Sequence, residues 1–401
     1  MRGRALALVV AIAAMSGVFV AAASAGERSA QDFGSYEWTE IYDGGGSDWE
    51  GRAGLQAVGL RNRLYVMGGR TPEPSMVNPF ASKLWDDVWE SRDNGSTWEL
   101  AAAGPAAGGS DALWPARGYF QAVTKGGTMY VMGGQNLPAS CPPGPPLCSE
   151  FFNDVWASRD GSNWVQKTAS APWTGRAGLS AIVFKGWIYV LGGSSGDDVA
   201  IGGLGRVLFN DVWRSRDGAS WEQVTDDAPW APRAGAAVVE KNGYIYLLGG
   251  EDGFLCDFGP GGLDCPYFND VWRTKDGADW ELVTAAADWT ARPGHQCQVL
   301  QDTIVCFGGF GFPVGDPTVP AHPRDVWTSR DGAVWQQVSD SPWNADGSED
   351  VKYDFDSLVV KGGPGGLRPS ILTFGGDREA SFAAPDPLLV DADVWRFSPP
   401  A

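Results

Sequence analysis

The chain has 401 residues, with 49 acidic side chains against 30 Lys and Arg, and a formal net charge of −19. A chain this acidic repels phosphate backbones, which argues against nucleic acid as a partner. The length alone allows one large domain or several ordinary ones.

The first 25 residues have the pattern of a secretory signal peptide. Arg2 and Arg4 precede an apolar run at 5–20, and small residues at 23–25 offer a cleavage site. The apolar run is short for a membrane span and no stop-transfer pattern follows, although an uncleaved anchor remains the alternative. We therefore expect a secreted or extracytoplasmic chain that is cut after Ala25, leaving residues 26–401 with no transmembrane segment.

The rest of the chain repeats one unit six times. Asp-Val-Trp begins at Asp87, Asp154, Asp211, Asp270, Asp325 and Asp393. A Gly-Gly pair ending an apolar run begins at Gly68, Gly133, Gly192, Gly249, Gly308 and Gly375. Within each unit, four short β-branched and aromatic segments are bounded by Gly, Asp or Asn, which is typical of four strands, called a to d here. A period of this length predicts a propeller or a solenoid.

These units resemble kelch repeats. The matching features are the apolar quartet before Gly-Gly, the Arg-x-Gly before strand a, and the aromatic residues after the glycines. The resemblance, which includes the kelch repeats of the galactose oxidase central domain, implies an all-β, six-bladed propeller that fills residues 26–401. The c–d turns depart from kelch and resemble sialidase Asp-boxes, as in residues 91–98, and we interpret them as structural turns.

The two chain ends predict how the ring closes. The last Asp-Val-Trp ends at Trp395, close to the C-terminus, and no strand d follows it. A strand-d pattern around Trp38 appears with no blade before it. We therefore expect the N-terminal strand to complete the sixth blade, which also removes an exposed sheet edge.

The 20 tryptophans follow the same period. Six lie in strand c, six in strand d and six in the d–a connection, so that only Trp85 and Trp187 fall outside the pattern. Such a row could be a sugar-stacking platform, but at this regular spacing we interpret it as packing between blades.

The d–a and b–c connections share one face of a propeller, and that face carries all the long variable loops. Binding residues tend to lie on such loops. An arginine precedes strand a in five blades, and because strand a is innermost we expect these side chains to ring the channel mouth. They are Arg52, Arg117, Arg176, Arg233 and Arg292. In kelch adaptor proteins, arginines at the matching position hold acidic peptides. The alternative is that each arginine pairs with a carboxylate of the neighbouring blade.

The six cysteines, an even number in an exported chain, predict disulfides. Two pairs, Cys141 with Cys148 and Cys256 with Cys265, would each close a b–c loop rich in Pro and Gly. The third, Cys297 with Cys306, would cross the a–b hairpin and put a two-residue turn at 301–302. Buried free thiols are the alternative for this third pair.

No motif for a catalytic centre or a cofactor stands out. With two histidines, His295 and His322, a His-rich metal centre is not expected. Acid clusters could bind Ca²⁺, although solvated loop acids are the alternative; they are Glu251-Asp252, Asp197-Asp198 and Asp391 with Asp393. The function we expect is therefore binding of a protein, peptide or acidic glycan by a monomer, through the loop face, without catalysis. One alternative is a lyase or epimerase of acidic sugars, whose acid or base would be Tyr353, His295, Asp377 or Glu379. A structural, envelope-associated protein is a further alternative.

Overall fold

The computed structural model describes residues 32–45, 48–73, 82–136, 148–197, 204–253, 267–310, 324–343, 352–362, 368–378 and 390–400, together with the backbone of 257–259 and 262–264. The expected signal peptide lies outside these residues. Of the segment Met1–Asp32 only Asp32 is described, and the described strands all belong to the unit Phe33–Ala401.

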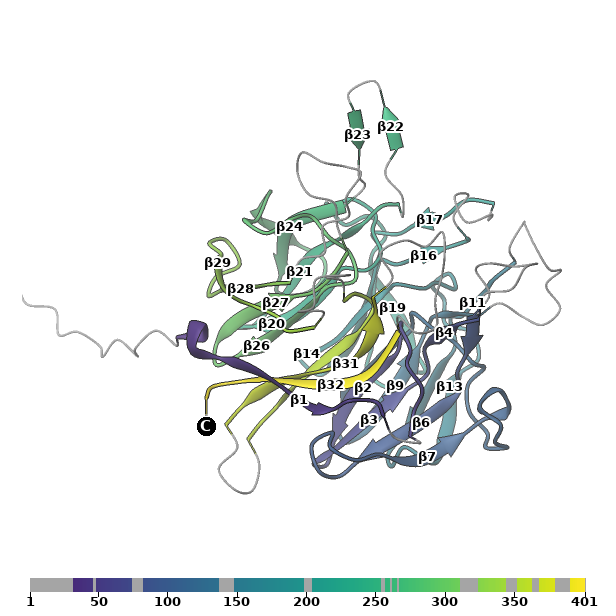
Figure 1. Ribbon diagram of the computed structural model, residues 1–401. Helices are drawn as coiled ribbons and strands as arrows, with labels where there is room; N and C mark the ends of the chain where they lie inside the picture. The colour runs from purple at the N-terminus through teal and green to yellow at the C-terminus, as the bar shows by residue number, and fades with distance from the viewer. Residues whose placement is uncertain are drawn as a thin grey trace, which may run out of the picture. The chain divides into compact units, whose positions relative to one another are not determined.

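Six four-stranded antiparallel sheets form the blades of a propeller, as the repeats predict (Figure 1). In blades 1 and 2 the strands, from innermost to outermost, are β2 (Gln56–Leu60), β3 (Arg63–Met67), β6 (Asp87–Ser91), β7 (Glu99–Ala103), then β8 (Gln121–Lys125), β9 (Thr128–Met132), β12 (Val155–Ser158), β13 (Trp164–Thr168). In blades 3 and 4 they are β14 (Ser180–Phe184), β15 (Trp187–Leu191), β18 (Val212–Ser215), β19 (Trp221–Thr225), then β20 (Ala237–Lys241), β21 (Tyr244–Glu251), β24 (Tyr267–Thr274), β25 (Trp280–Thr284). In blades 5 and 6 they are β26 (Gln296–Leu300), β27 (Thr303–Phe307), β28 (Asp325–Ser329), β29 (Gln336–Asp340), then β30 (Asp356–Val360), β31 (Ser370–Asp377), β32 (Val390–Ser398), β1 (Glu37–Tyr42).

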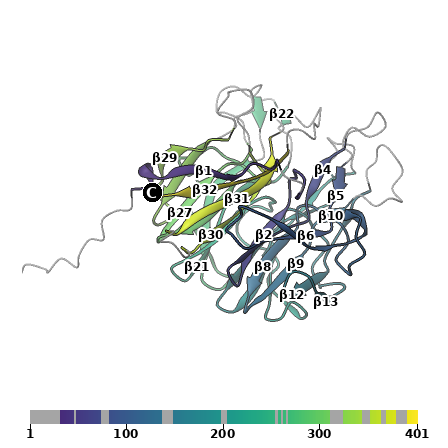
Figure 2. The same cartoon turned by 60° about the horizontal axis from the view of Figure 1, so that its bottom comes forward.

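The sixth blade confirms the predicted closure. β1 pairs antiparallel with β32, with Trp38 opposite Phe397, so the N-terminal strand supplies strand d of the last blade. The purple β1 and the yellow β32 run side by side in both views (Figures 1 and 2). The innermost strands also contact one another all the way round, from β2 with β8 to β30 with β2.

The a–b hairpins have the predicted register. Cys297 lies opposite Cys306, and the corresponding pair in blade 2 is Ala122 with Val131. The turns of blades 1 to 5 have two residues, both with positive φ, such as Lys185 at 46° and Gly186 at 77°. This is the type I′ geometry whose twist matches that of the flanking strands.

The tryptophans pack between blades, as expected. Each d–a tryptophan is at most 3% exposed and stands edge-on to a strand-d tryptophan, with centroids 4.4–6.0 Å apart. The pairs are Trp49–Trp98, Trp114–Trp164, Trp173–Trp221, Trp230–Trp280, Trp289–Trp335 and Trp343–Trp38. Apolar burial and edge-to-face contact together stabilise this packing, so these rings are core and no sugar platform.

Short antiparallel ribbons begin the b–c loops, where the sequence predicted only long variable segments. They are β4 (Arg70–Pro72) with β5 (Ser82–Leu84), β10 (Gln135–Asn136) with β11 (Glu150–Phe151), and β16 (Ser194–Ser195) with β17 (Val207–Leu208). In blade 4, β22 (Asp257–Gly259) pairs with β23 (Gly262–Asp264). Two 3₁₀ turns, η1 (Phe33–Ser35) and η2 (Pro105–Ala107), complete the described elements. These ribbons fix the positions of the first residues of the loop face.

Candidate functional site at the channel mouth

The five arginines expected at the mouth are buried in their own blades. Arg117 shows the pattern: Nη1 and Nη2 donate to the two carboxylate oxygens of Asp154 at 2.7 and 3.0 Å, and Nη1 also donates to the Gly133 carbonyl. The Trp156 indole donates to the same carboxylate at 2.8 Å. The equivalent pairs are Arg52–Asp87, Arg176–Asp211, Arg233–Asp270 and Arg292–Asp325.

These guanidinium groups are therefore bound within the protein and do not face a ligand in the channel. The five arginines are between 0 and 2% exposed, and each clamps the Asp of Asp-Val-Trp against the first glycine of Gly-Gly. The ion-pair alternative describes this geometry, with the partner in the same blade rather than the neighbouring one. In blade 6, Lys352 replaces the arginine and binds Asp391 and Asp393 at 2.9 and 2.6 Å. Burial opposes its charge, but these two carboxylates hold the pKa of Lys352 above its usual value.

Two residues after each of these cations, the backbone forms a ring around the channel. Each N–H donates to the carbonyl of the equivalent residue in the preceding blade, at 2.7–3.2 Å, and all six residues have φ between 51° and 65°. The ring residues are Gly54, Tyr119, Gly178, Gly235, Gly294 and Asp354. Two of them, Tyr119 and Asp354, thus bring side chains to a position that glycine holds in the other four blades.

A second set of six positions follows the Gly-Gly pairs on the loop face, where charged residues occur in three blades. Arg70 donates from Nε to the Tyr119 hydroxyl at 2.6 Å and from Nη2 to Asp377 at 2.5 Å. Across the channel, Nη2 of Arg206 donates to Glu251 at 2.8 Å. We call Arg70, Tyr119, Arg206, Glu251, Asp354 and Asp377 the channel-mouth site.

The pKa of Asp354 depends on both ion pairs of this site, Arg70–Asp377 and Arg206–Glu251. Enclosure by the channel wall and the charge of Asp377 raise the pKa of Asp354 to about 7, Arg70 opposing them. Glu251 raises that pKa further and Arg206 lowers it. Burial likewise raises the pKa of Tyr119, so that its hydroxyl stays protonated. The site therefore offers a carboxyl group that can exchange a proton near neutral pH.

A cavity of about 210 Å³ runs into the channel from the ring, and both Tyr119 and Asp354 line it. Polar side chains in the cavity wall bond to the backbone of the next blade. Gln56 accepts from the Ala122 N–H at 2.9 Å, and Asp356 accepts from the Ala57 N–H at 2.6 Å. Each such bond joins neighbouring blades. Side chains that line the channel beyond the ring therefore also join the inner strands of neighbouring blades.

The other acid–base candidates from the sequence have different positions. Asp377 belongs to the site and is fully buried. Tyr353 is buried against Phe310, 5.3 Å between ring centroids. His295 is 2% exposed and packs on Trp289, and burial lowers its pKa to about 3, so it stays neutral. Glu379 and His322 lie outside the described residues.

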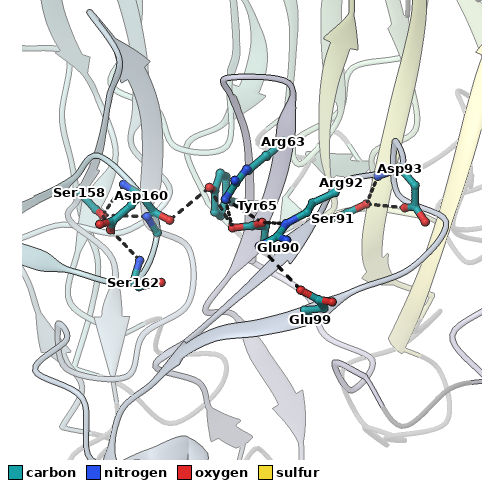
Figure 3. A network of polar contacts seen from close by, with 11 residues as sticks. Arg63, Tyr65, Glu90, Ser91, Arg92, Asp93, Glu99, Ser158, Asp160 and Ser162 are labelled. Carbon is teal, nitrogen blue, oxygen red and sulfur yellow. Dashed lines mark hydrogen bonds and ion pairs between the residues drawn. The ribbon is translucent and has the colours of Figure 1, made fainter. Parts of the chain in front are cut away.

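The opposite face is built from the Asp-box turns, which the structure shows to be structural. Asp160 accepts from the N–H groups of Ser162 and Asn163 at 3.0 and 2.8 Å. The Tyr65 hydroxyl of the preceding blade bonds the Asp160 carbonyl at 3.2 Å and also bonds Glu90 (Figure 3). The turns thus connect neighbouring blades.

The cysteines fall partly within the described residues. Cys297 and Cys306 form the predicted disulfide across the hairpin. Cys148 is also disulfide-bonded, and its predicted partner Cys141 lies outside the described residues, as do Cys256 and Cys265.

Neither a metal cluster nor a membrane-spanning helix occurs among the residues that the structure describes. No group of three or more His, Cys, Asp or Glu is arranged there to hold a metal, and no helix in that part is long and apolar enough to cross a bilayer. The acids considered for Ca²⁺ have other partners: Glu251 binds Arg206, Asp391 and Asp393 bind Lys352, and Asp197 accepts from Ser149.

A family model, the KLHDC2/KLHL20/DRC7 kelch-repeats domain, matches residues 54–309, more than half of the chain. The chain belongs to the kelch-repeat family. One curated relative, N-acetylneuraminate epimerase 2 of Escherichia coli O6:H1, is 25% identical over 212 residues, covering 46% of this chain and 54% of the relative. The chain thus matches about half the length of that relative. A solved structure, that of YjhT, superposes with a TM-score of 0.60 at 16% identity, over 88% of this chain and 96% of that one, which shows a shared fold.

Proposed function

We propose that this kelch propeller binds an acidic sugar, a small carboxylate with several hydroxyl groups, at the channel-mouth site. The observation that carries the proposal is that two groups there, Arg206 and Asp354, keep hydrogen-bonding positions that no described residue uses. Arg206 is 13% exposed and makes hydrogen bonds within the described residues only through Nη2, so Nε and Nη1 remain as donors. Asp354 reaches the cavity, and its carboxyl group makes no hydrogen bond to the described part of the chain.

These two groups match the chemistry of such a ligand. A guanidinium group forms short, charge-assisted hydrogen bonds with a carboxylate. Carboxyl oxygens such as those of Asp354 and Glu251 accept hydrogen bonds from hydroxyl groups. Among the described residues of the site, Arg70 is paired with Asp377, and Arg206 keeps Nε and Nη1 as further donors. A protein or peptide could also use the loop face. Of the six channel-mouth residues, Tyr119 and Asp354 line the cavity of about 210 Å³, so a small part of a ligand could enter it beside them.

Calorimetric titration of the full chain tests this proposal. The ligands are N-acetylneuraminate, glucuronate and glucose as the neutral comparison. We expect the acidic sugars to bind more tightly than glucose, and Arg206→Gln to remove that preference. A matched control, Arg92→Gln, changes a 62% exposed arginine on the opposite face and should leave binding unchanged. Equal affinities for wild type and Arg206→Gln would refute the proposal.

A second candidate function is catalysis on the bound sugar, in keeping with the name of the curated relative. Asp354, whose pKa is about 7, could act as general acid or base. Proton magnetic resonance would detect it as faster exchange between the anomers of N-acetylneuraminate when the protein is added. Binding without faster exchange leaves the protein a binding module.

A further inference from the structure

The ring around the channel does not itself need a side chain from Tyr119 or Asp354. Its six hydrogen bonds join backbone atoms only, and glycine makes them equally well in four blades. Glycine reaches positive φ without strain, whereas other residues pay about 1–2 kcal/mol for that conformation. Tyr119 at 55° is the costlier of the two, because asparagine and aspartate tolerate this region better than bulky residues do. Strain of this kind is typical of functional sites.

Both side chains turn toward the channel, each over a neighbouring glycine. A Cβ on Gly54 would lie 3.0 Å from the Tyr119 ring, and one on Gly294 would lie 2.8 Å from the Asp354 carboxylate. The two glycines therefore leave the space that these side chains occupy. Both side chains line the loop-face end of the cavity, whose other lining residues are the ring glycines and the inner strands. They therefore lie between the cavity and the charged groups of the channel mouth, as the floor of the channel-mouth site.

The charged groups that face Asp354 come from several blades. Arg70 and Asp377 belong to blades 1 and 6, and Arg206 and Glu251 to blades 3 and 4. With Asp354 ionised, these groups carry three negative charges against two positive ones. A ligand carboxylate would then add a fourth negative charge to a partly enclosed site, which like-charge repulsion opposes.

The other described residues near Asp354 do not change this balance of charges. Blade 2 contributes Tyr119, whose raised pKa keeps it neutral. Blade 5 contributes Gly294, and the adjacent His295 is neutral because burial lowers its pKa to about 3. Lys352, next to the ring in blade 6, and Arg378 together balance the charges of Asp391 and Asp393. Among the described groups, protonation of Asp354 thus removes the negative charge that would oppose binding of an anion.

We propose that Tyr119 and Asp354 are the specificity-determining floor of the channel-mouth site, and that Asp354 meets an acidic sugar as a neutral carboxyl group, so that binding takes up a proton. This inference rests on the proposed function. In the bound state the carboxyl O–H donates to a ligand oxygen, while Arg206 holds the ligand carboxylate. The proton comes from solvent, and no covalent bond of the sugar changes.

The experiment is calorimetry with N-acetylneuraminate at pH 6, 7 and 8, at pH 7 in two buffers of different ionisation enthalpy. If the pKa of Asp354 is about 7 before binding, affinity should fall about tenfold from pH 6 to pH 8, and the buffers should report uptake of about half a proton at pH 7. The sugar carboxylate stays ionised throughout this range, so it does not contribute.

Two variants identify the responsible groups. Asp354→Asn keeps a hydrogen-bond donor and tolerates positive φ, so it should bind with nearly constant affinity across this range and without proton uptake. Tyr119→Gly copies four other blades, so it should fold and bind more weakly. Asp331→Asn, in an Asp-box on the opposite face, is the control and should keep the wild-type pH profile.

The outcomes separate the two proposals. Binding of N-acetylneuraminate without proton uptake, or with a pH profile that Asp354→Asn retains, overturns this inference and leaves the proposed function standing. Absence of binding by any acidic sugar at pH 6 overturns both.

Discussion

Replacing Arg176 with alanine tests the role that the structure gives to the buried arginines. The change removes two hydrogen bonds to Asp211, one to the Gly192 carbonyl and one to the Thr174 carbonyl. The Asp211 carboxylate is only 14% exposed and would keep the Trp213 indole as its remaining donor. Breaking a buried pair from one side typically costs 3–5 kcal/mol, and partial exposure of Asp211 favours the lower end, about 3 kcal/mol.

Thermal unfolding of the two proteins measures this cost. Unfolding entropy of about 2.1 cal/mol/K per residue over Phe33–Ala401 gives roughly 0.8 kcal/mol/K, so the expected fall in Tm is about 4 °C. Arg92→Ala is the comparison, because Arg92 is 62% exposed and its partner Glu90 keeps Arg63 and Tyr65 (Figure 3). That change should cost less than about 1 kcal/mol. Equal falls in Tm for the two variants would refute the stabilising role of Arg176. An Arg176→Ala protein that keeps its stability but loses its ligand would instead support a role of Arg176 in binding at the channel mouth.

Three further outcomes are expected. Burial raises the pKa of Asp356 to about 7 in the folded protein, above its unfolded value near 4, so stability should fall as pH rises from 4 to 7; denaturation by urea should show a smaller fall for Asp356→Asn. Replacing Cys297 and Cys306 together with alanine should lower the free energy of unfolding by about 2–3 kcal/mol, since a short closed loop is released; an unchanged denaturation midpoint would contradict this. Deleting residues 26–43 should leave the outer edge of β32 unpaired and cause loss of soluble monomer in gel filtration, whereas a deletion that keeps full thermal stability would contradict the closure.

The repeat pattern predicted the fold in detail because each blade is specified by local signals. Short apolar segments, Gly-containing turns and the orphan strand around Trp38 were enough to derive six blades, their closure and the Cys297–Cys306 register. These features depend on periodicity and turn chemistry, which are visible in one chain.

The arginine prediction failed to locate a free anion site for a physical reason. Spacing places Arg117 near the channel, but its side-chain direction depends on Asp154, 37 residues later, which the repeat pattern identified only as a marker of the blade. Once Arg117 and Asp154 are both buried in one blade, leaving either charge without the other would be strongly destabilising, so the arginine binds the aspartate and does not point into the channel.

Of the channel-mouth site, the sequence offered only Asp377 as a candidate acid or base and Glu251 as a candidate Ca²⁺ ligand, and the other members were missed because they break the repeat or follow it in single blades. Tyr119 and Asp354 replace a ring glycine, and comparing the six units position by position would have revealed both. Arg206 comes from a variable loop with no repeat equivalent, and only the fold brings it next to Glu251.

A crystal structure of the protein with N-acetylneuraminate tests the central claim most directly. The account predicts the sugar at the channel mouth, with its carboxylate within hydrogen-bond distance of Arg206 and another of its oxygens at the Asp354 carboxyl group. A sugar that binds in solution but occupies another surface in the crystal, such as the Asp-box turns around Asp160, would contradict it.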